Sequence, residues 1–249
     1  MGGDMAGTTY AGGPARVSSR EHDQQLTRWR LLVLATLSAA IVAGLAVLIV
    51  HEWSPLLSLD QSIDDALHSF ALSTQWVTGT AKALTALGDF WSTWTLAAAA
   101  VVILLLLRRL RPALLVLLCA IVAPTLGNWL KGVVDRPRPV WSDPIILAPD
   151  NAAYPSGHAI AGIAVWCVVG VALGRCARSD SWAALIAFPF ILIGIGIGLS
   201  RLVLGVHWPS DVVGGWFLAL GVIAVAVAWL IVVPPAAPLK SPPNGQLRT

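Results

Sequence analysis

Six long apolar runs constrain the fold of this chain more than any other feature of its sequence. They lie at roughly 31–50, 91–107, 113–130, 158–174, 182–200 and 212–233. Each is close to the length that an α-helix needs to cross a hydrocarbon core of about 30 Å, although the second and the fourth are short. A backbone inside lipid must satisfy its own hydrogen bonds, and the alternating pattern of a membrane barrel is missing, so we expect helices. The sequence therefore predicts an all-α, polytopic membrane protein with six transmembrane helices.

The composition agrees with a membrane location. Hydrophobic residues make up 57% of the chain and charged residues 12%, about half the charged share of a soluble domain. Several tryptophans lie near the ends of the apolar runs, as in an interfacial belt: Trp91, Trp94, Trp129, Trp182 and Trp229. The three cysteines lack metal-ligand spacing, so we expect neither a zinc site nor a disulfide framework.

The two ends of the chain differ in composition from the apolar runs. Residues 1–30 are rich in Gly, Ser, Thr and Arg, which predicts a disordered N-terminus. Residues 234–249 are rich in Pro and predict a flexible tail. Between these ends, residues 31–233 are expected to form one six-span domain.

The segment 51–90 lies within this domain but is not a span. Apolar residues recur at helical spacing from Leu59 to Phe70, which predicts an amphipathic helix, and a second short helix is expected over 74–87. Both are expected to lie at the membrane surface or to cap the bundle. The opposite, solvated side of the first helix should hold Asp60, Asp64 and Asp65. His51 and His68 are interpreted as surface residues of the same loop.

The distribution of basic residues predicts the orientation in a cell inner (plasma) membrane. With six spans, both termini share a side with the loops 108–112 and 175–181. Eleven of the 16 basic residues lie on that side: Arg16, Arg20, Arg28, Arg30, Arg108, Arg109, Arg111, Arg175, Arg178, Lys240 and Arg248. Basic residues concentrate on the cytoplasmic side, so both termini should be cytoplasmic and the segment 51–90 extracytoplasmic.

Three polar stretches interrupt the apolar pattern, and the topology brings all of them to the extracytoplasmic face. Their polar residues are Lys131 and Arg138, then Ser156 and His158, then Arg201, His207 and Asp211. Charged groups at a boundary between helix and lipid are costly and are usually functional. We therefore expect these side chains to converge in one site.

The cations of this set suit a phosphate. Lys131, Arg138 and Arg201 offer many hydrogen-bond donors and no acceptor, which matches an anion with several oxygens. The fourth helix should begin near Ser156 and Gly157, where its free N–H groups and dipole also favour an anion. Gly157 would let the backbone approach that anion closely.

The two histidines suit different roles. His207 precedes Asp211 by four residues, so the carboxylate can accept from one ring nitrogen and leave the other free to attack. His158 comes from another loop and could donate a proton to the leaving oxygen. An ordinary histidine pKa of about 6.5 permits either role near neutral pH.

These residues resemble the three motifs of the type 2 phosphatidic acid phosphatase superfamily. Six residues separate Lys131 from Arg138-Pro139, "PSGH" occupies 155–158, and Ser200-Arg201 precedes His207 and Asp211 with the family's spacing. The stretch "LTALGDFW" at 84–91 is also similar to the family's region before the second span.

The resemblance implies a fold, a mechanism and a set of roles. The fold is the family's haloperoxidase-like helical core, and the activity is that of a phosphatase without metal or other cofactor. His207 is implied as the nucleophile that forms a phosphohistidine, Asp211 as its orienting residue and His158 as the acid. Residues implied to hold the phosphate are Lys131, Arg138, Ser156, Gly157 and Arg201. Arg136 matches a frequently basic position, and is either a further phosphate ligand or a head-group anchor.

An outward site next to lipid predicts a lipid phosphate as substrate and the bilayer as partner, with no nucleic acid. Undecaprenyl diphosphate, hydrolysed to undecaprenyl phosphate, is the first expectation. Phosphatidic acid and phosphatidylglycerol phosphate are the alternatives. Two other classes stay open at this point: a vanadate-dependent haloperoxidase, and a non-enzymatic membrane transporter or scaffold. The oligomeric state does not follow from the sequence.

Overall fold

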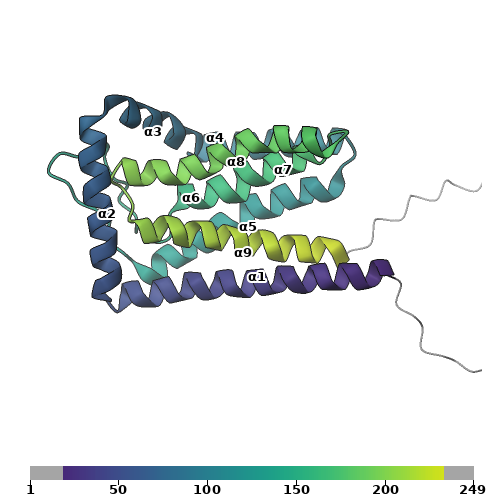
Figure 1. Ribbon diagram of the computed structural model, residues 1–249, viewed down its shortest axis with the longest axis horizontal. Coiled ribbons are helices and arrows are strands. Elements are labelled where there is room, and N and C mark those ends of the chain that lie inside the picture. The colour runs from purple at the N-terminus through teal and green to yellow at the C-terminus, as the bar shows by residue number, and fades with distance from the viewer. Residues whose placement is uncertain (1–18, 233–249) are drawn as a thin grey trace, which may run out of the picture.

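The computed structural model describes residues 19–232, and in this part of the chain it contains helices and no strand (Figure 1). The elements are α1 (Ser19–Val50), α2 (Ser54–Ser73), α3 (Gln75–Leu87), α4 (Phe90–Leu106), α5 (Leu110–Val134), α6 (Gly157–Ala161), the π-helix η1 (Gly162–Cys167), α7 (Val168–Gly174), α8 (Asp180–Val203) and α9 (Pro209–Val232). The predicted all-α fold is confirmed.

The expected spans correspond to these helices with one difference. Five spans are long enough and apolar enough by themselves: α1, α5, the continuous run α6–η1–α7, α8 and α9. The remaining candidate is a bent pair of helices, because α4, with 17 residues, meets α3 at an angle of 54°. The predicted run 91–107 is therefore α4, which lies at the short end of the range for a spanning helix.

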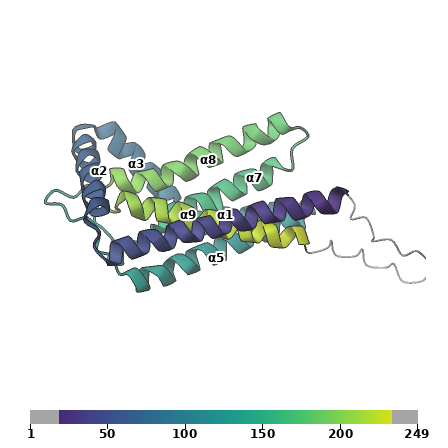
Figure 2. The same cartoon turned by 60° about the horizontal axis from the view of Figure 1, so that its bottom comes forward.

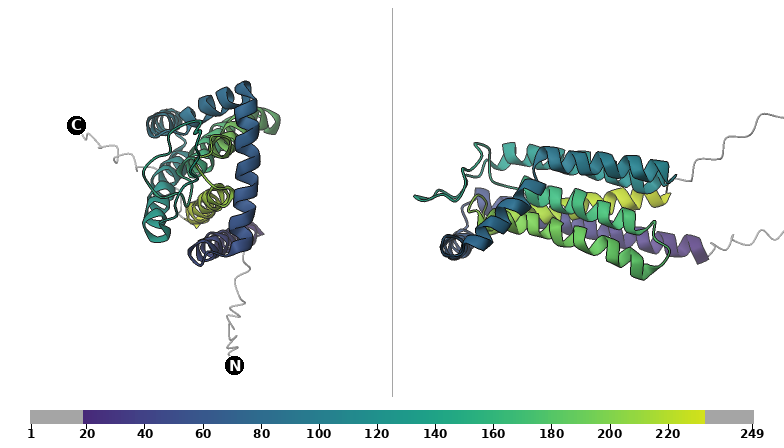
Figure 3. Two further views of the ribbon diagram at one scale, coloured as in Figure 1. Left: turned by 90° about the vertical axis from the view of Figure 1, so that its left-hand side faces the viewer. Right: turned by 90° about the horizontal axis from the view of Figure 1, so that it is seen from above.

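The spans are arranged so that one end of the bundle carries all three polar stretches. In Figures 1 and 2, α1 begins and α9 ends at one end of the bundle, while α2 crosses the other end. The end-on view in Figure 3 shows α2 running across the bundle beside α1, α8 and α9. The long loop between α5 and α6 and the short loop between α8 and α9 lie at this same end (Figure 1).

The prediction of disorder over 1–30 is wrong for residues 19–30, because α1 already begins at Ser19. The residues from 19 onward include no Gly or Pro before Gly44. The helix of the apolar run can therefore extend toward the N-terminus without a helix-breaking residue. Residues 1–18 and the predicted tail at 234–249 lie outside the described residues.

The amphipathic helix α2 is present, but two of its three aspartates face the bundle. Asp64 is 0% exposed and Asp60 is also buried, whereas Leu59 is 55% exposed. The prediction of a solvated acidic face is therefore wrong for these two residues. The outer side of α2 lies at the rim of an apolar bundle, so apolar side chains suit it, while the inner side meets the polar end of α9.

His68, predicted as a surface residue, is also buried on this inner side of α2. Its ring stacks on Trp141 with centroids 3.8 Å apart, and its Nε2 lies 3.3 Å from Asp143. The Trp141 indole N–H donates to the carbonyl of Gly205 over 2.9 Å. These contacts fasten the loop between α5 and α6 to the residues just before His207.

Small residues let the spans below the site pack closely. Gly162 in η1 and Gly194 in α8 touch through their backbones, and a Cβ on either would overlap the other's carbonyl. A Cβ on Gly198 would lie 2.6 Å from the indole nitrogen of Trp216. Such contacts between small residues are typical of helix pairs in membranes, and π-helical turns are frequent near functional sites.

Candidate active site

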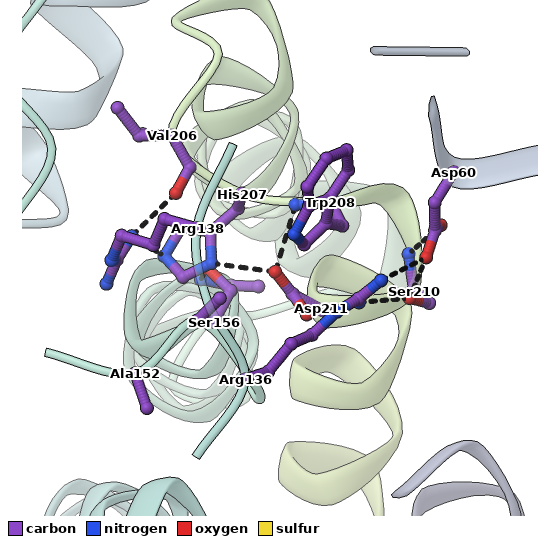
Figure 4. Close-up of polar contacts among 12 residues, drawn as sticks. Asp60, Arg136, Arg138, Ala152, Ser156, Val206, His207, Trp208, Ser210 and Asp211 are labelled. Atoms are coloured by element: carbon purple, nitrogen blue, oxygen red, sulfur yellow. Dashed lines mark hydrogen bonds and ion pairs between the residues drawn. The ribbon is translucent and has the colours of Figure 1, made fainter. Parts of the chain in front are cut away.

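His207 and Asp211 form the centre of the polar end. His207 lies in the loop before α9, and Asp211 lies in the first turn of that helix. The Asp211 Oδ2 atom is 3.3 Å from His207 Nδ1 and also accepts the Trp208 backbone N–H over 2.9 Å. Both side chains are buried, and Figure 4 shows the carboxylate between the imidazole and the start of α9.

Arg138 defines which nitrogen of His207 is free. Its Nη1 atom lies 2.8 Å from His207 Nε2 (Figure 4). A guanidinium only donates, so Nε2 must be the acceptor in this contact and the ring proton must be on Nδ1, facing Asp211. Nε2 therefore carries the lone pair that is available to attack.

The cations beside His207 donate to backbone carbonyls. Arg138 donates to the carbonyl of Val206 over 2.6 Å and to that of Asn151 over 2.8 Å. Lys131 donates to the carbonyls of Ala152 and Ala153. Neutral carbonyls are weaker partners for a cation than the oxygens of a phosphate, so these donors suit an incoming anion.

The electrostatic environment keeps His207 neutral. Burial lowers the pKa of His207 well below its ordinary value, and the positive charges of Arg138, Arg201 and Lys131 lower it further. Among these three cations, Arg138 is the one with a contact to the ring within the described residues. A neutral imidazole is the form that can act as a nucleophile.

Arg201 has a buried donor that lacks an acceptor. Its Nη1 atom donates to Thr85 Oγ1 over 2.6 Å, while its buried Nε has no hydrogen-bond partner within residues 19–232. Leaving a charged donor unsatisfied in a buried place is costly, typically about 1–3 kcal/mol or more. An anion bound between Arg201 and His207 would satisfy this donor.

His158 is held by a residue that the sequence did not indicate. Its Nε2 atom lies 3.1 Å from Asp89 Oδ1, and Asp89 precedes the first residue of α4. Gly88 allows this corner to approach the ring, because a Cβ on Gly88 would lie 2.6 Å from His158 Cδ2. The corner between α3 and α4 therefore positions His158.

Ser156 and Gly157 begin the fourth span beside this pair. The Ser156 backbone N–H donates to the carbonyl of Asp211 over 3.0 Å, which ties α6 to α9. The Ser156 hydroxyl caps α6 by accepting from the Ala159 N–H. A Cβ on Gly157 would meet no atom of the described residues within 4 Å, so open space lies above this residue.

Arg136 takes a different position from the other predicted cations. Its guanidinium donates to Asp211 Oδ1, to Asp60 Oδ2 and to the hydroxyl of Ser210. It is 5% exposed and lies over the ring of Trp208. The side chain is thus occupied by carboxylates on the far side of Asp211 from His207 (Figure 4).

Sequence analysis missed three residues of the site: Asp60, Thr85 and Asp89. The helical pattern placed Asp60 on a solvated face. Thr85 and Asp89 lie in the stretch 84–91, whose similarity to the family is the one available signal. Fold and site together define a multi-span helical membrane protein whose polar end holds a buried histidine–aspartate pair beside basic side chains.

Comparison with known proteins gives the family. Residues 112–233 match the PAP2 superfamily. An undecaprenyl-diphosphatase of Sulfolobus acidocaldarius is 31% identical over 107 residues, 41% of this chain and 48% of that protein, so the chain spans about half of its length. A decaprenylphosphoryl-5-phosphoribose phosphatase of Mycobacterium tuberculosis is 31% identical over 166 residues, 65% of this chain and 84% of that protein.

Phosphatidylglycerophosphatase B of Bacillus subtilis is 26% identical over 166 residues, 64% of this chain and 79% of that protein. The crystal structure of a transmembrane PAP2-type phosphatidylglycerolphosphate phosphatase from Bacillus subtilis has the same fold. Its TM-score is 0.68 at 22% identity, over 81% of this chain and 96% of that one. The chain belongs to the PAP2 superfamily of membrane phosphatases, which confirms the resemblance of its three motifs.

Proposed function

We propose that this protein is a metal-independent lipid phosphatase that hydrolyses undecaprenyl diphosphate to undecaprenyl phosphate through a phosphohistidine on His207. The observation that carries this proposal is the environment of that ring. Asp211 accepts a hydrogen bond from Nδ1–H, Arg138 borders Nε2, and the pKa of His207 is lowered by burial and by nearby cations. A neutral, oriented imidazole among fixed positive charges is suited to attack a phosphorus atom.

The first chemical step transfers the terminal phosphoryl group to the protein. Arg138 turns from Nε2 to a phosphate oxygen, and the freed lone pair attacks the terminal phosphorus. The bond from phosphorus to the bridging oxygen breaks, and His158 gives its proton to that oxygen. Asp211 stabilises the positive charge that develops on the ring of His207.

The second step hydrolyses the phosphohistidine. Water attacks the phosphorus, the bond to Nε2 breaks, and His158 accepts the proton of the water as a general base. Inorganic phosphate leaves and His207 returns to its neutral form. Lys131, Arg138 and Arg201 hold the equatorial oxygens in both steps, aided by the backbone at Ser156 and Gly157.

An apolar cavity supports a long lipid chain as the rest of the substrate. About 550 Å³ of space lies between α1, α5 and α9, lined by apolar side chains only. At the polar end it is bounded by Leu130, which directly precedes Lys131, and by Val42, whose carbonyl accepts the Tyr154 hydroxyl over 2.7 Å. A chain lying in this cavity would leave its phosphate close to the cations of the site.

A second candidate substrate also has a polyprenyl chain, but a different head group. The Mycobacterium tuberculosis relative, named as a phosphatase of decaprenylphosphoryl-5-phosphoribose, aligns with this chain over 84% of its own length. That observation favours a phosphate monoester on a polyprenyl-linked sugar. Phosphatidylglycerol phosphate and phosphatidic acid remain further alternatives with the same chemistry at phosphorus.

We also place the site on the extracytoplasmic side of the inner membrane. The excess of basic residues near the termini and in the loops 108–112 and 175–181 supports this orientation. The diphosphate head group would then be hydrolysed on the face that lies opposite both termini. This orientation can be tested with a variant whose single cysteine replaces Asp150. In intact cells, that cysteine should react with a membrane-impermeant thiol reagent.

Phosphate release from the purified protein in detergent, with chelator present, tests the proposed function. The four lipids named above are compared side by side, and the polyprenyl substrates are expected to give the highest kcat/KM. His207→Gln should reduce turnover by at least about 10⁴-fold, as loss of a nucleophile does in other hydrolases. His51→Gln, which changes an exposed histidine of the same protein, is the matched control and should retain full activity.

Phosphohistidine formation is measured directly by acid-free quenching with substrate labelled at the terminal phosphate. The label should remain on the wild-type protein and be absent from His207→Gln. Release of phosphate by His207→Gln at the wild-type rate, or loss of wild-type activity in chelator, would contradict the mechanism.

A further inference from the structure

A buried charge network connects α2 to the catalytic pair. Arg136 donates to Asp211 Oδ1 over 2.8 Å and to Asp60 Oδ2 over 2.7 Å. Asp60 is the residue that brings α2 into contact with this guanidinium, across 76 positions of the chain. All three side chains are buried, so solvent screens their charges little.

The same network holds the first turn of α9. Asp60 accepts the Ser210 backbone N–H over 2.9 Å, and its other oxygen accepts the Ser210 hydroxyl. The Ser210 hydroxyl also accepts from Arg136 over 2.7 Å. A carboxylate is favourable at a helix N-terminus, so Asp60 stabilises the turn that carries Asp211.

The two carboxylate oxygens of Asp211 have different partners. Oδ1 is bound by Arg136, while Oδ2 receives Trp208 N–H and faces His207 Nδ1. With Oδ1 fixed, rotation of the carboxylate is blocked, and Oδ2 stays directed at the ring. The orientation of His207 therefore depends on a guanidinium that does not touch it.

We propose that Asp60 and Arg136 are positioning residues of the reaction, fixing the Asp211 carboxylate and through it the tautomer of His207. The inference rests on the proposed function for its effect on turnover. It also explains the placement of α2, which lies across the end of the bundle and delivers the carboxylate of Asp60. Arg136 contacts neither the reacting nitrogen nor the predicted phosphate-binding side chains in this structure.

Removing either residue has a defined electrostatic result. Without Asp60, Arg136 keeps one counter-charge instead of two, and the Ser210 N–H loses its acceptor. Without Arg136, two buried carboxylates face each other across Ser210 with no cation between them. In both cases Asp211 is free to turn, and a mixture of His207 tautomers should result.

A double-variant cycle separates this role from general stabilisation. Asp60→Asn and Arg136→Gln should each lower kcat by about 10-fold to 100-fold with KM nearly unchanged, as loss of an outer orienting partner does at other sites. If Asp60 acts through Arg136, the double variant should lose no more than Arg136→Gln alone. Asp65→Asn, on the exposed side of the same helix, is the matched control and should keep the wild-type kcat.

A spectroscopic measurement reads the tautomer without any substrate. Protein labelled with ¹⁵N-histidine is measured in detergent, and the His207 signals are assigned by their loss in His207→Gln. Inorganic phosphate is present in both samples, because it draws Arg138 away from Nε2 and leaves the tautomer to Asp211. The wild type should then show His207 with its proton on Nδ1, and Asp60→Asn should show a mixture with the other tautomer. Arg136→Lys gives the same readings if Arg136→Gln does not fold, because lysine keeps the charge but cannot bind two carboxylates in the same geometry.

The outcomes are distinct. An unchanged His207 tautomer in Asp60→Asn, or losses of kcat that multiply in the double variant, would overturn the positioning role. A wild-type protein that hydrolyses none of the lipids would instead refute the proposed function. The tautomer spectra would still decide whether Asp60 and Arg136 orient His207.

Discussion

Asp89 Oδ1 lies 3.1 Å from His158 Nε2, so the second histidine of the site, like the first, has a carboxylate partner. The two carboxylates come from different elements of the fold. Asp211 reaches His207 from within α9, whereas Asp89 reaches His158 from the bend between α3 and α4. The bent pair of helices therefore serves the site as well as the membrane crossing.

Replacing Asp89 tests the assignment of His158 as the acid. Asp89→Asn should lower kcat by about 10-fold to 100-fold, because the ring loses the charged partner that orients it. The loss should be smaller for a substrate with a good leaving group, such as p-nitrophenyl phosphate, which needs little protonation. Equal losses on both substrates would argue against a role in proton transfer.

Gly88 should tolerate no side chain. A Cβ there would lie 2.6 Å from His158 Cδ2 and would also overlap Ile197, so Gly88→Ala must displace the bend. We expect a loss of stability of about 1–3 kcal/mol, as for other overpacked positions, together with a lower kcat. Gly79→Ala, within the helix α3 that Gly88 terminates, is the control, since a Cβ there meets nothing within 4 Å. Thermal unfolding and phosphate release of both variants provide the comparison.

The lowered pKa of His207 predicts the pH dependence of phosphohistidine formation. The nucleophile stays neutral as the pH falls through about 6.5, where an ordinary histidine would become half protonated. The single-turnover rate should therefore lack an inflection at that pH, and its decline should come at clearly lower pH. Rapid-quench measurements of this rate between about pH 5 and 8 test the prediction. A decline of the rate centred near pH 6.5 would contradict a His207 that burial and nearby cations keep neutral.

The spans and the three polar stretches followed from the sequence because each depends on neighbours along the chain. An apolar run of spanning length becomes a helix, and the order of six runs decides that Lys131, His158 and His207 share one end. His207 and Asp211 are four residues apart, so their contact follows from the loop that precedes α9. These parts of the fold and site need no long-range information.

The partners of these residues could not be predicted in the same way. Asp89 and His158 are separated by 69 positions, and Asp60 and Arg136 by 76, so no local pattern pairs them. The face of α2 was also assigned wrongly, because the rule that polar residues face outward assumes water outside and an apolar core inside. At the rim of a membrane bundle both assumptions change, and Asp60 and Asp64 face inward.

Asp64 should make stability depend on pH. Burial, and then the negative charges of Asp65, Asp211 and Asp60, raise its pKa to about 7. Neither carboxylate oxygen has a hydrogen-bond partner within residues 19–232. Between about pH 4, where the unfolded carboxyl titrates, and pH 7 the folded state holds a proton that the unfolded state has lost. The contribution of Asp64 to stability therefore falls as pH rises through this window, by up to about 1.4 kcal/mol per pH unit, and is constant above it.

Asp64→Asn removes this dependence. The melting temperature of the variant relative to wild type should be higher at pH 8 than at pH 5, because only the wild type buries a charge at the higher pH. Each kcal/mol corresponds to roughly 2–4 °C for a chain of this size. Asp65→Asn should show a smaller difference of the same sign, because it removes one of the negative charges that raise the pKa of Asp64. A constant difference for Asp64→Asn would mean that this carboxyl titrates normally.

The cavity between α1, α5 and α9 should discriminate substrates by chain length. Ala39 lines it, so Ala39→Trp should fill part of its volume of about 550 Å³. We expect kcat/KM for undecaprenyl diphosphate to fall at least about 10-fold, since several methyl and methylene contacts worth about 0.8 kcal/mol each are lost. Hydrolysis of the much shorter farnesyl diphosphate should change little, because its phosphate site is intact. Ala40→Trp, an exposed position of the same helix outside the cavity, controls for the bulk of the indole; equal losses in both variants would remove the cavity from the path of the lipid chain.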